Sequence, residues 1–156
     1  MKRSFAMFVV FVLLLAAGSR ALAESNPFVG TWKLNVAASK FSPGPPPQSQ
    51  MRIWDASGKV RITGVNAAGK TVAYSYPIKG DGKNYPTVGA IPNGAKSISS
   101  KKIDANTFVA NFTKTGKQVE TTTFTVSKDG KSLIIEAKGV LPTGQALNNE
   151  THWDKQ

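Results

Sequence analysis

Residues 26–35 read Asn-Pro-Phe-Val-Gly-Thr-Trp-Lys-Leu-Asn, and this stretch decides how the rest of the chain is interpreted. Because side chains alternate along a β-strand, four of its residues would share one face of a strand: Phe28, Gly30, Trp32 and Leu34. Gly30 allows a close approach by another backbone, and the indole of Trp32 can close off a core. We therefore assign Gly30 and Trp32 a structural role at one end of a β-sheet core.

The residues before this stretch have the pattern of an export signal. Residues 1–3 are Met-Lys-Arg, residues 5–17 are apolar, and residues 21–23 are Ala-Leu-Ala, a small-x-small cleavage site. The apolar run is too short to cross a bilayer comfortably, although an uncleaved anchor is the alternative. We predict a signal peptide at residues 1–23, no stable membrane anchor after its removal, and a location in the periplasm or outside the cell.

Composition limits what residues 24–156 can be. Their number suits one domain with one core. The chain contains no Cys, which excludes disulfides, thiolate metal sites and thiol catalysis. Its formal charge of +11 becomes +8 when Lys2, Arg3 and Arg20 of the signal are removed. The remaining lysines are dispersed among turns, a pattern typical of a soluble surface, so we expect no specific nucleic-acid partner.

Strand patterns continue to the end of the chain. Clusters of turn-forming residues recur about every 8–12 residues, which is typical of an all-β sandwich or barrel. Between them lie alternating runs such as residues 72–76 and 108–112, and no stretch has a sustained helical period, although residues 36–40 could form one helical turn. We predict ten strands, at residues 28–35, 48–56, 59–66, 71–78, 84–88, 96–103, 107–114, 118–127, 132–138 and 147–154.

Most links between these strands are too short for crossover connections, so consecutive strands should be antiparallel neighbours. Closure would remove exposed sheet edges, so we predict an antiparallel up-and-down β-barrel of about ten strands, with a two-sheet sandwich as the alternative. The three long links, residues 36–47, 89–95 and 139–146, are the first, fifth and ninth. They should therefore gather at one end of the barrel, with tight turns and the Trp32 strand at the other.

The sequence also resembles a known group of proteins. Gly30-Thr31-Trp32 on the first strand, shortly after a signal peptide, resembles the G-x-W signature of the lipocalin (calycin) families, and the ten-strand count resembles their fatty-acid-binding-like members. Residues 30–35 followed by residues 39–44 resemble the opening of small exported lipocalin-like proteins of bacteria. The resemblance implies that a basic side chain near the C-terminus packs on the Trp, and the terminal strand offers only Lys155 for this role.

No group of residues has the spacing of an active site. The single histidine, His152, alternates with polar neighbours and should face water. The carboxylates are scattered, without a close pair for acid–base chemistry or a calcium-binding loop. We therefore predict no enzymatic activity, no catalytic residue, no metal and no cofactor.

The aromatic residues are the better candidates for a functional site. Tyr74 and Tyr76 share one face of a predicted strand, and Phe108 and Phe112 share one face of another. In one interpretation the four side chains line a cavity and bind a ligand whose polar end meets the phenols. In the other interpretation they fill the core.

Two arginines lie on neighbouring predicted strands. Arg52 alternates with Met51 and Ile53, and Arg61 alternates with Val60 and Ile62, so we expect both arginines to face solvent. The alternative places Arg52 inside with Trp54, where the pair would suit an anionic head group.

The sequence as a whole predicts a non-enzymatic, exported β-barrel that binds a small apolar or amphipathic ligand. The alternative is a structural or interaction domain with a filled core that docks to anionic envelope components. Ile91 and Leu141 lie on two of the long links, and both interpretations place these two side chains near each other over the barrel mouth. The oligomeric state does not follow from the sequence.

Overall fold

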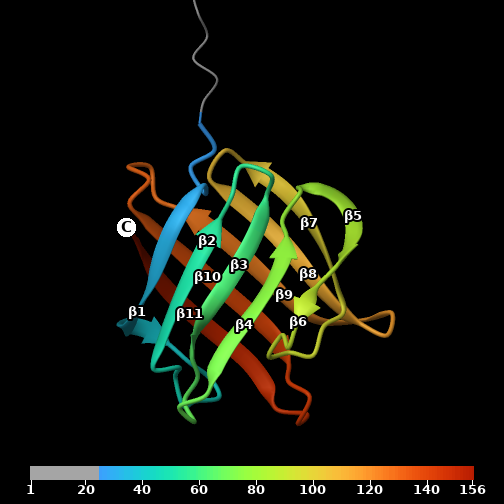
Figure 1. Ribbon diagram of the computed structural model, residues 1–156. Coiled ribbons are helices and arrows are strands. Elements are labelled where there is room, and N and C mark those ends of the chain that lie inside the picture. Colours follow the sequence, from blue (N-terminus) through green and yellow to red (C-terminus); the bar gives the residue numbers. More distant parts are fainter. Residues whose placement is uncertain (1–24) are drawn as a thin grey trace, which may run out of the picture.

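The computed structural model describes residues 25–156, and the predicted signal peptide at residues 1–23 lies outside the described residues. The assigned elements are all β-strands (Figure 1). They are β1 (Gly30–Lys40), β2 (Ser49–Trp54), β3 (Lys59–Val65), β4 (Thr71–Pro77), β5 (Asp81–Pro86), β6 (Val88–Gly89), β7 (Ser97–Asp104), β8 (Thr107–Lys114), β9 (Lys117–Val126), β10 (Ser132–Val140) and β11 (Ala146–Lys155). The described residues contain no helix with the length and hydrophobicity that spanning a membrane requires.

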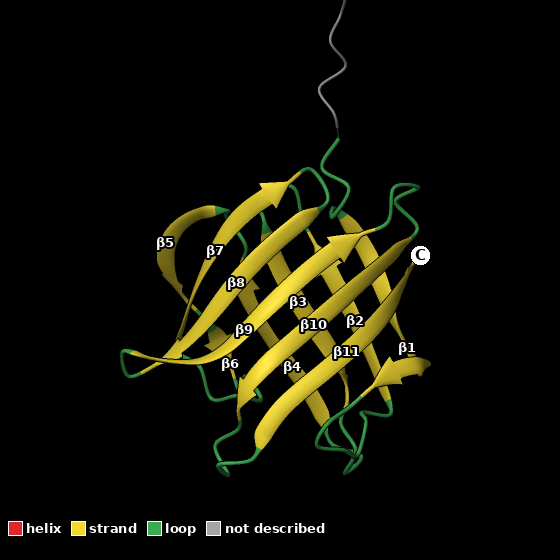
Figure 2. Cartoon of the chain, turned by 180° about the vertical axis from the view of Figure 1, so that it is seen from behind, coloured by secondary structure: helices red, strands yellow, loops and turns green. Residues whose placement is uncertain are grey.

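The strands form one antiparallel sheet in the order β5-β7-β8-β9-β10-β11-β1-β2-β3-β4-β6. Its two outermost strands, β5 and β6, are separated in the chain by Thr87 alone. Since β5 pairs with β7 and β6 pairs with β4, residues 81–89 bring the two edges of the sheet together, and the sheet curves into a barrel (Figures 1 and 2). The predicted antiparallel barrel is confirmed, and the sandwich alternative is wrong.

Two predicted strand assignments differ from the structure. The single strand expected at residues 84–88 is divided into β5 and β6, so the sheet has eleven strands. Residues 36–40 form no helical turn but extend β1, which pairs again with β11 at Lys40 and Glu150 after an irregularity that begins at Asn35. There the Asn35 side chain accepts a hydrogen bond from the Ala38 amide at 3.1 Å, which stabilises the distortion.

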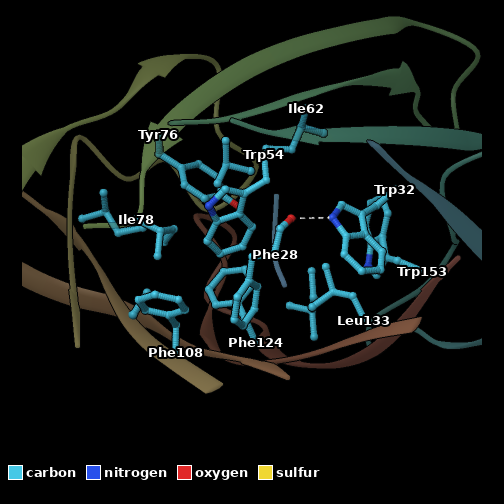
Figure 3. Packing of buried hydrophobic residues seen from close by; sticks show 14 of the residues in the cluster. Phe28, Trp32, Trp54, Ile62, Tyr76, Ile78, Phe108, Phe124, Leu133 and Trp153 are labelled. Carbon is cyan, nitrogen blue, oxygen red and sulfur yellow. Dashed lines mark hydrogen bonds between the residues drawn. The ribbon is translucent and has the colours of Figure 1, made fainter. Parts of the chain in front are cut away.

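One end of the barrel is filled by aromatic side chains (Figure 3). The ring of Phe28 lies 4.7 Å from that of Trp54 and 4.9 Å from that of Phe108, and Trp54 also meets Phe124 edge-on at 5.7 Å. Such offset and edge-to-face contacts add to the stabilisation from apolar burial. This end therefore contains the packed core.

Trp32 lies beside this core and is fully buried. Its Nε1 donates a 2.9 Å hydrogen bond to the Phe28 carbonyl, drawn in Figure 3. The Lys155 ammonium lies 4.9 Å from the centre of the indole ring. Gly30 has φ +142°, and a Cβ there would lie 2.8 Å from Cε of Lys155, so a side chain would obstruct the lysine as it crosses the Trp.

The long links all lie at the other end. The turn between β2 and β3 is at the top of Figure 1, at the core end, whereas the β3–β4 and β10–β11 links are at the bottom. Residues 41–48, 90–96 and 141–145 all contribute to one cavity there. The predicted grouping of the three long links is therefore confirmed.

Candidate functional site: a cavity at the open end of the barrel

The barrel interior between the core and the long links contains a cavity of about 440 Å³. This volume lies within the range of about 300–1,000 Å³ that is usual for small-molecule sites. Ile91 and Leu141, from two different links, both line it, as the sequence predicted. Phe41 and three prolines of residues 41–48 cover another side: Pro43, Pro45 and Pro47.

The links over the cavity are tied to the barrel wall. The Ser42 amide donates to Oδ1 of Asn149 on β11 at 2.8 Å, and the Asn148 amide donates to the Ser42 carbonyl at 2.7 Å. In residues 90–96, Asn93 is only 4% exposed and its Nδ2 donates to Oε2 of Glu120 on β9 at 2.8 Å. The mouth of the cavity is therefore held by specific contacts.

Three of the four predicted ligand-binding aromatics line this cavity. Tyr76 stacks with Tyr74, with ring centres 6.4 Å apart, and meets Phe112 edge-on at 5.2 Å. Phe108 does not line the cavity, because it packs with Phe28 in the closed end. Phe108 and Phe112 share a face of β8, but four residues along a strand cover about 13 Å, so the two rings lie at different depths in the barrel. That the three lining residues bind a ligand remains a prediction.

The expectation that Arg52 faces solvent is wrong, whereas Arg61 is exposed as expected. Arg52 is only 6% exposed and lines the cavity, on the same face of β2 as Trp54. Its guanidinium carbon lies 4.7 Å from the Trp153 ring centre, and its Nη1 donates a 2.6 Å hydrogen bond to the Tyr76 hydroxyl. A planar guanidinium can stack on aromatic rings, which makes this inward position tolerable.

Within the described part of the chain, the surroundings of Arg52 leave its guanidinium without a carboxylate at salt-bridge distance, although Glu120 lines the same cavity. In residues 25–156 its guanidinium is in no salt bridge, and its Nε is buried without a hydrogen-bond partner. The aromatic rings around it provide only partial compensation. Arg52 is thus a buried cation at the wall of the cavity.

Glu120 is a lining residue that the sequence interpretation missed. Its Oε1 accepts a 2.5 Å hydrogen bond from Thr122, and its Oε2 accepts the bond from Asn93. Burial raises the pKa of the Glu120 carboxyl above its ordinary value of 4.5, while these hydrogen bonds and the charge of Arg52 act in the opposite direction. Glu120 lies on the same face of its strand as Thr122, Phe124 and Val126, and this shared face was the signal that could have identified an inward side chain.

The tyrosines remain neutral at physiological pH. Burial raises the pKa of both the Tyr74 and Tyr76 phenols above the ordinary value of 10.0. Because the Tyr76 oxygen accepts a hydrogen bond from Arg52, the Tyr76 hydroxyl can still donate a hydrogen bond to another group. The lining of the cavity therefore combines a cation with phenolic donors.

His152 lies on the outer face of β11, as predicted, with Nε2 3.0 Å from Glu150 Oε1. The opposite face of β11 contributes four residues to the cavity: Leu147, Asn149, Thr151 and Trp153. Among the described residues, no group of three or more His, Cys, Asp or Glu is placed to hold a metal ion.

Comparisons with known proteins find similarity in structure. No protein-family model matches the chain. No curated protein matches it either. Its structure is similar to that of the zebrafish ileal bile acid-binding protein complexed with cholic acid, with a TM-score of 0.48 and 14% sequence identity, over 83% of this chain and 99% of that chain. Nothing about the ligand of the present chain follows from a likeness at this level.

Proposed function

We propose that this protein is a non-enzymatic binding protein that holds a small amphipathic molecule inside its barrel. The observation that carries the proposal is the cavity of about 440 Å³ between the aromatic core and the long links. Its walls combine apolar groups, such as Ile135 and Leu147, with the polar groups of Arg52 and Glu120. An apolar wall with a few converging polar groups is typical of small-molecule sites.

We also propose that the protein is an exported member of the lipocalin-like barrels. Gly30-Thr31-Trp32 and the contact of Lys155 with the indole support this relationship, and the sequence of residues 1–23 supports export. N-terminal sequencing of the protein recovered from a periplasmic or culture fraction should find Glu24 first. Recovery of an intact Met1 in the membrane fraction would contradict export by cleavage.

The rival function is an interaction domain with a filled core. The closed end of the barrel is filled, but the cavity at the open end favours the binding function. The two functions predict different effects of a substitution that fills the cavity. It should abolish binding by a protein that uses its interior, and it should not affect an interaction domain that uses its outer surface.

Substitution at Ala137 separates them. Ala137 on β10 lines the cavity, and the next residue, Lys138, is exposed on the other face of the same strand. The full protein should bind anilinonaphthalene sulfonate saturably. Ala137→Trp should reduce the affinity about tenfold or more, because the indole would occupy the cavity. Lys138→Trp should leave the affinity unchanged. Circular dichroism checks that both variants fold. Absence of saturable binding, or equal loss in both variants, would contradict the proposed function.

A further inference from the structure

The cavity lining contains one cation and one anion among the described residues, Arg52 and Glu120. They come from different parts of the barrel wall, Arg52 from β2 and Glu120 from β9. The two side chains do not form a salt bridge with each other. Their different surroundings indicate what kind of molecule the cavity accepts.

Arg52 is the side chain that lacks a salt-bridge partner in the part of the chain that the structure describes, and its Nε has no hydrogen bond there. Burial of a charge is unfavourable unless an opposite charge or several hydrogen bonds compensate it. Here the guanidinium has one hydrogen bond, to Tyr76, and contacts with aromatic rings. An anionic group placed in the cavity beside Arg52 would supply an opposite charge at contact distance, and it could also accept a hydrogen bond from the Tyr76 hydroxyl.

Glu120 is the side chain that already has partners, because Thr122 and Asn93 both donate to its carboxylate. The polar or charged groups that face it are Arg52 from β2, Tyr74 and Tyr76 from β4, Asn93 from residues 90–96 and Thr122 from its own strand. Its partners on the adjacent strands, Phe112 and Gly139, carry no charge. A second negative charge in the cavity would therefore act on Glu120 directly.

We propose that the cavity takes an amphipathic anion whose acidic head group pairs with the guanidinium of Arg52, and that Glu120 gains a proton when this anion binds. The inference rests on the proposed function and specifies the chemical class of the ligand and its control by pH. The protonated carboxyl group no longer repels the head group, and it can donate a hydrogen bond.

The direction of the pH effect follows from linkage. A bound anion raises the pKa of Glu120 above its value in the free protein, which burial already raises. At a pH between the pKa of Glu120 in the free protein and its pKa in the complex, binding of the anion is therefore accompanied by uptake of a proton. Affinity is highest where Glu120 is already protonated and decreases as the pH rises through this interval.

Octyl sulfate and octanol test the inference, because they share one alkyl chain and the sulfate remains ionised throughout the accessible pH range. Their binding to the full protein is measured by isothermal titration calorimetry, in buffers of different ionisation enthalpy to count protons. Octyl sulfate should bind more tightly than octanol and with proton uptake. Arg52→Met should lower the affinity for octyl sulfate about tenfold to a hundredfold and should change the affinity for octanol little. Arg61→Met, an exposed control on β3, should change neither.

The second variant addresses Glu120. Glu120→Gln should bind octyl sulfate several-fold more tightly at neutral pH, with no proton uptake, whereas Glu136→Gln, at an exposed position on β10, should behave like the unchanged protein. Equal affinities for the sulfate and the alcohol, or a pH dependence that survives in Glu120→Gln, would overturn the inference while leaving the proposed function intact. Failure of both compounds to bind would overturn the proposed function and the inference with it.

Discussion

Lys155, near the C-terminus, extends across Trp32 near the start of the barrel: its Nζ lies 4.9 Å from the indole centre and donates a 3.1 Å hydrogen bond to the Pro27 carbonyl. β1 and β11 are also paired in the sheet, with Trp32 opposite Lys155. The lysine therefore joins the two ends of the described chain over the aromatic core. Lysine here takes the place that the family resemblance assigns to a basic residue near the C-terminus.

Replacement of Trp32 by Ala should lower the free energy of unfolding by about 3–5 kcal/mol, because it leaves a cavity beside the core and removes the hydrogen bond to Phe28. Chemical denaturation monitored by circular dichroism measures the change. Lys155→Met should cost about 1 kcal/mol, since a partly exposed cation–π contact contributes little. A Trp32→Ala variant as stable as the unchanged protein would mean that the indole does not support the core.

Arg52→Met should leave the stability of the barrel unchanged or increase it. Methionine has an apolar side chain of similar length, and exchanging a poorly compensated buried charge for an apolar group is often neutral or stabilising. Thermal denaturation compares it with Arg61→Met, which changes an exposed residue. A loss of about 3 kcal/mol or more, as when one member of a buried ion pair is removed, would show that Arg52 is compensated by the protein itself.

Glu120→Gln should change how stability depends on pH. The folded protein raises the pKa of this carboxyl, so the unfolded chain ionises more readily, and the contribution of Glu120 to stability decreases as the pH rises from about 4.5 through the folded-state pKa. The stability of Glu120→Gln relative to the unchanged protein should therefore increase over this interval. Denaturant titrations at several pH values measure the difference. A difference that is constant with pH, or that decreases as the pH rises, would contradict a raised pKa.

Asn93→Ala should loosen residues 90–96 without unfolding the barrel. The Asn93 side chain donates to Glu120 and accepts a 2.9 Å hydrogen bond from the Ala95 amide, so its loss removes both contacts. Hydrogen exchange should accelerate at residues 94–96 and remain slow in β8 and β9. Asn66→Ala, in the link between β3 and β4, should accelerate exchange only near residues 66–70, where Asn66 accepts bonds from Ala68 and Lys70. Unchanged exchange at residues 94–96 would mean that Asn93 does not hold this link.

The strand pattern predicted much of the fold because it depends on local alternation and on turn residues. Every second residue from Phe28 to Leu34 and from Leu147 to Trp153 faces inward, as their alternation indicated. The long links meet at one end because successive antiparallel strands alternate in direction. Alternation was ambiguous for β2, whose two faces both carry apolar side chains. Met51 and Ile53 suggested that Arg52 was outside, whereas Trp54, on the same face as Arg52, indicated the inside correctly.

By itself, the sequence determined the class of fold, the face of most side chains and the position of Trp32, since alternation along a strand repeats every two residues and needs no knowledge of distant parts of the chain. Only the tertiary structure decided which inward side chains lie at the same depth. Strand register and barrel closure place Phe108 in the core and Phe112 at the cavity. They also bring Arg52, Tyr76 and Glu120 from separate strands to the same cavity. These are contacts between residues far apart in sequence, so a local pattern contains no information about them.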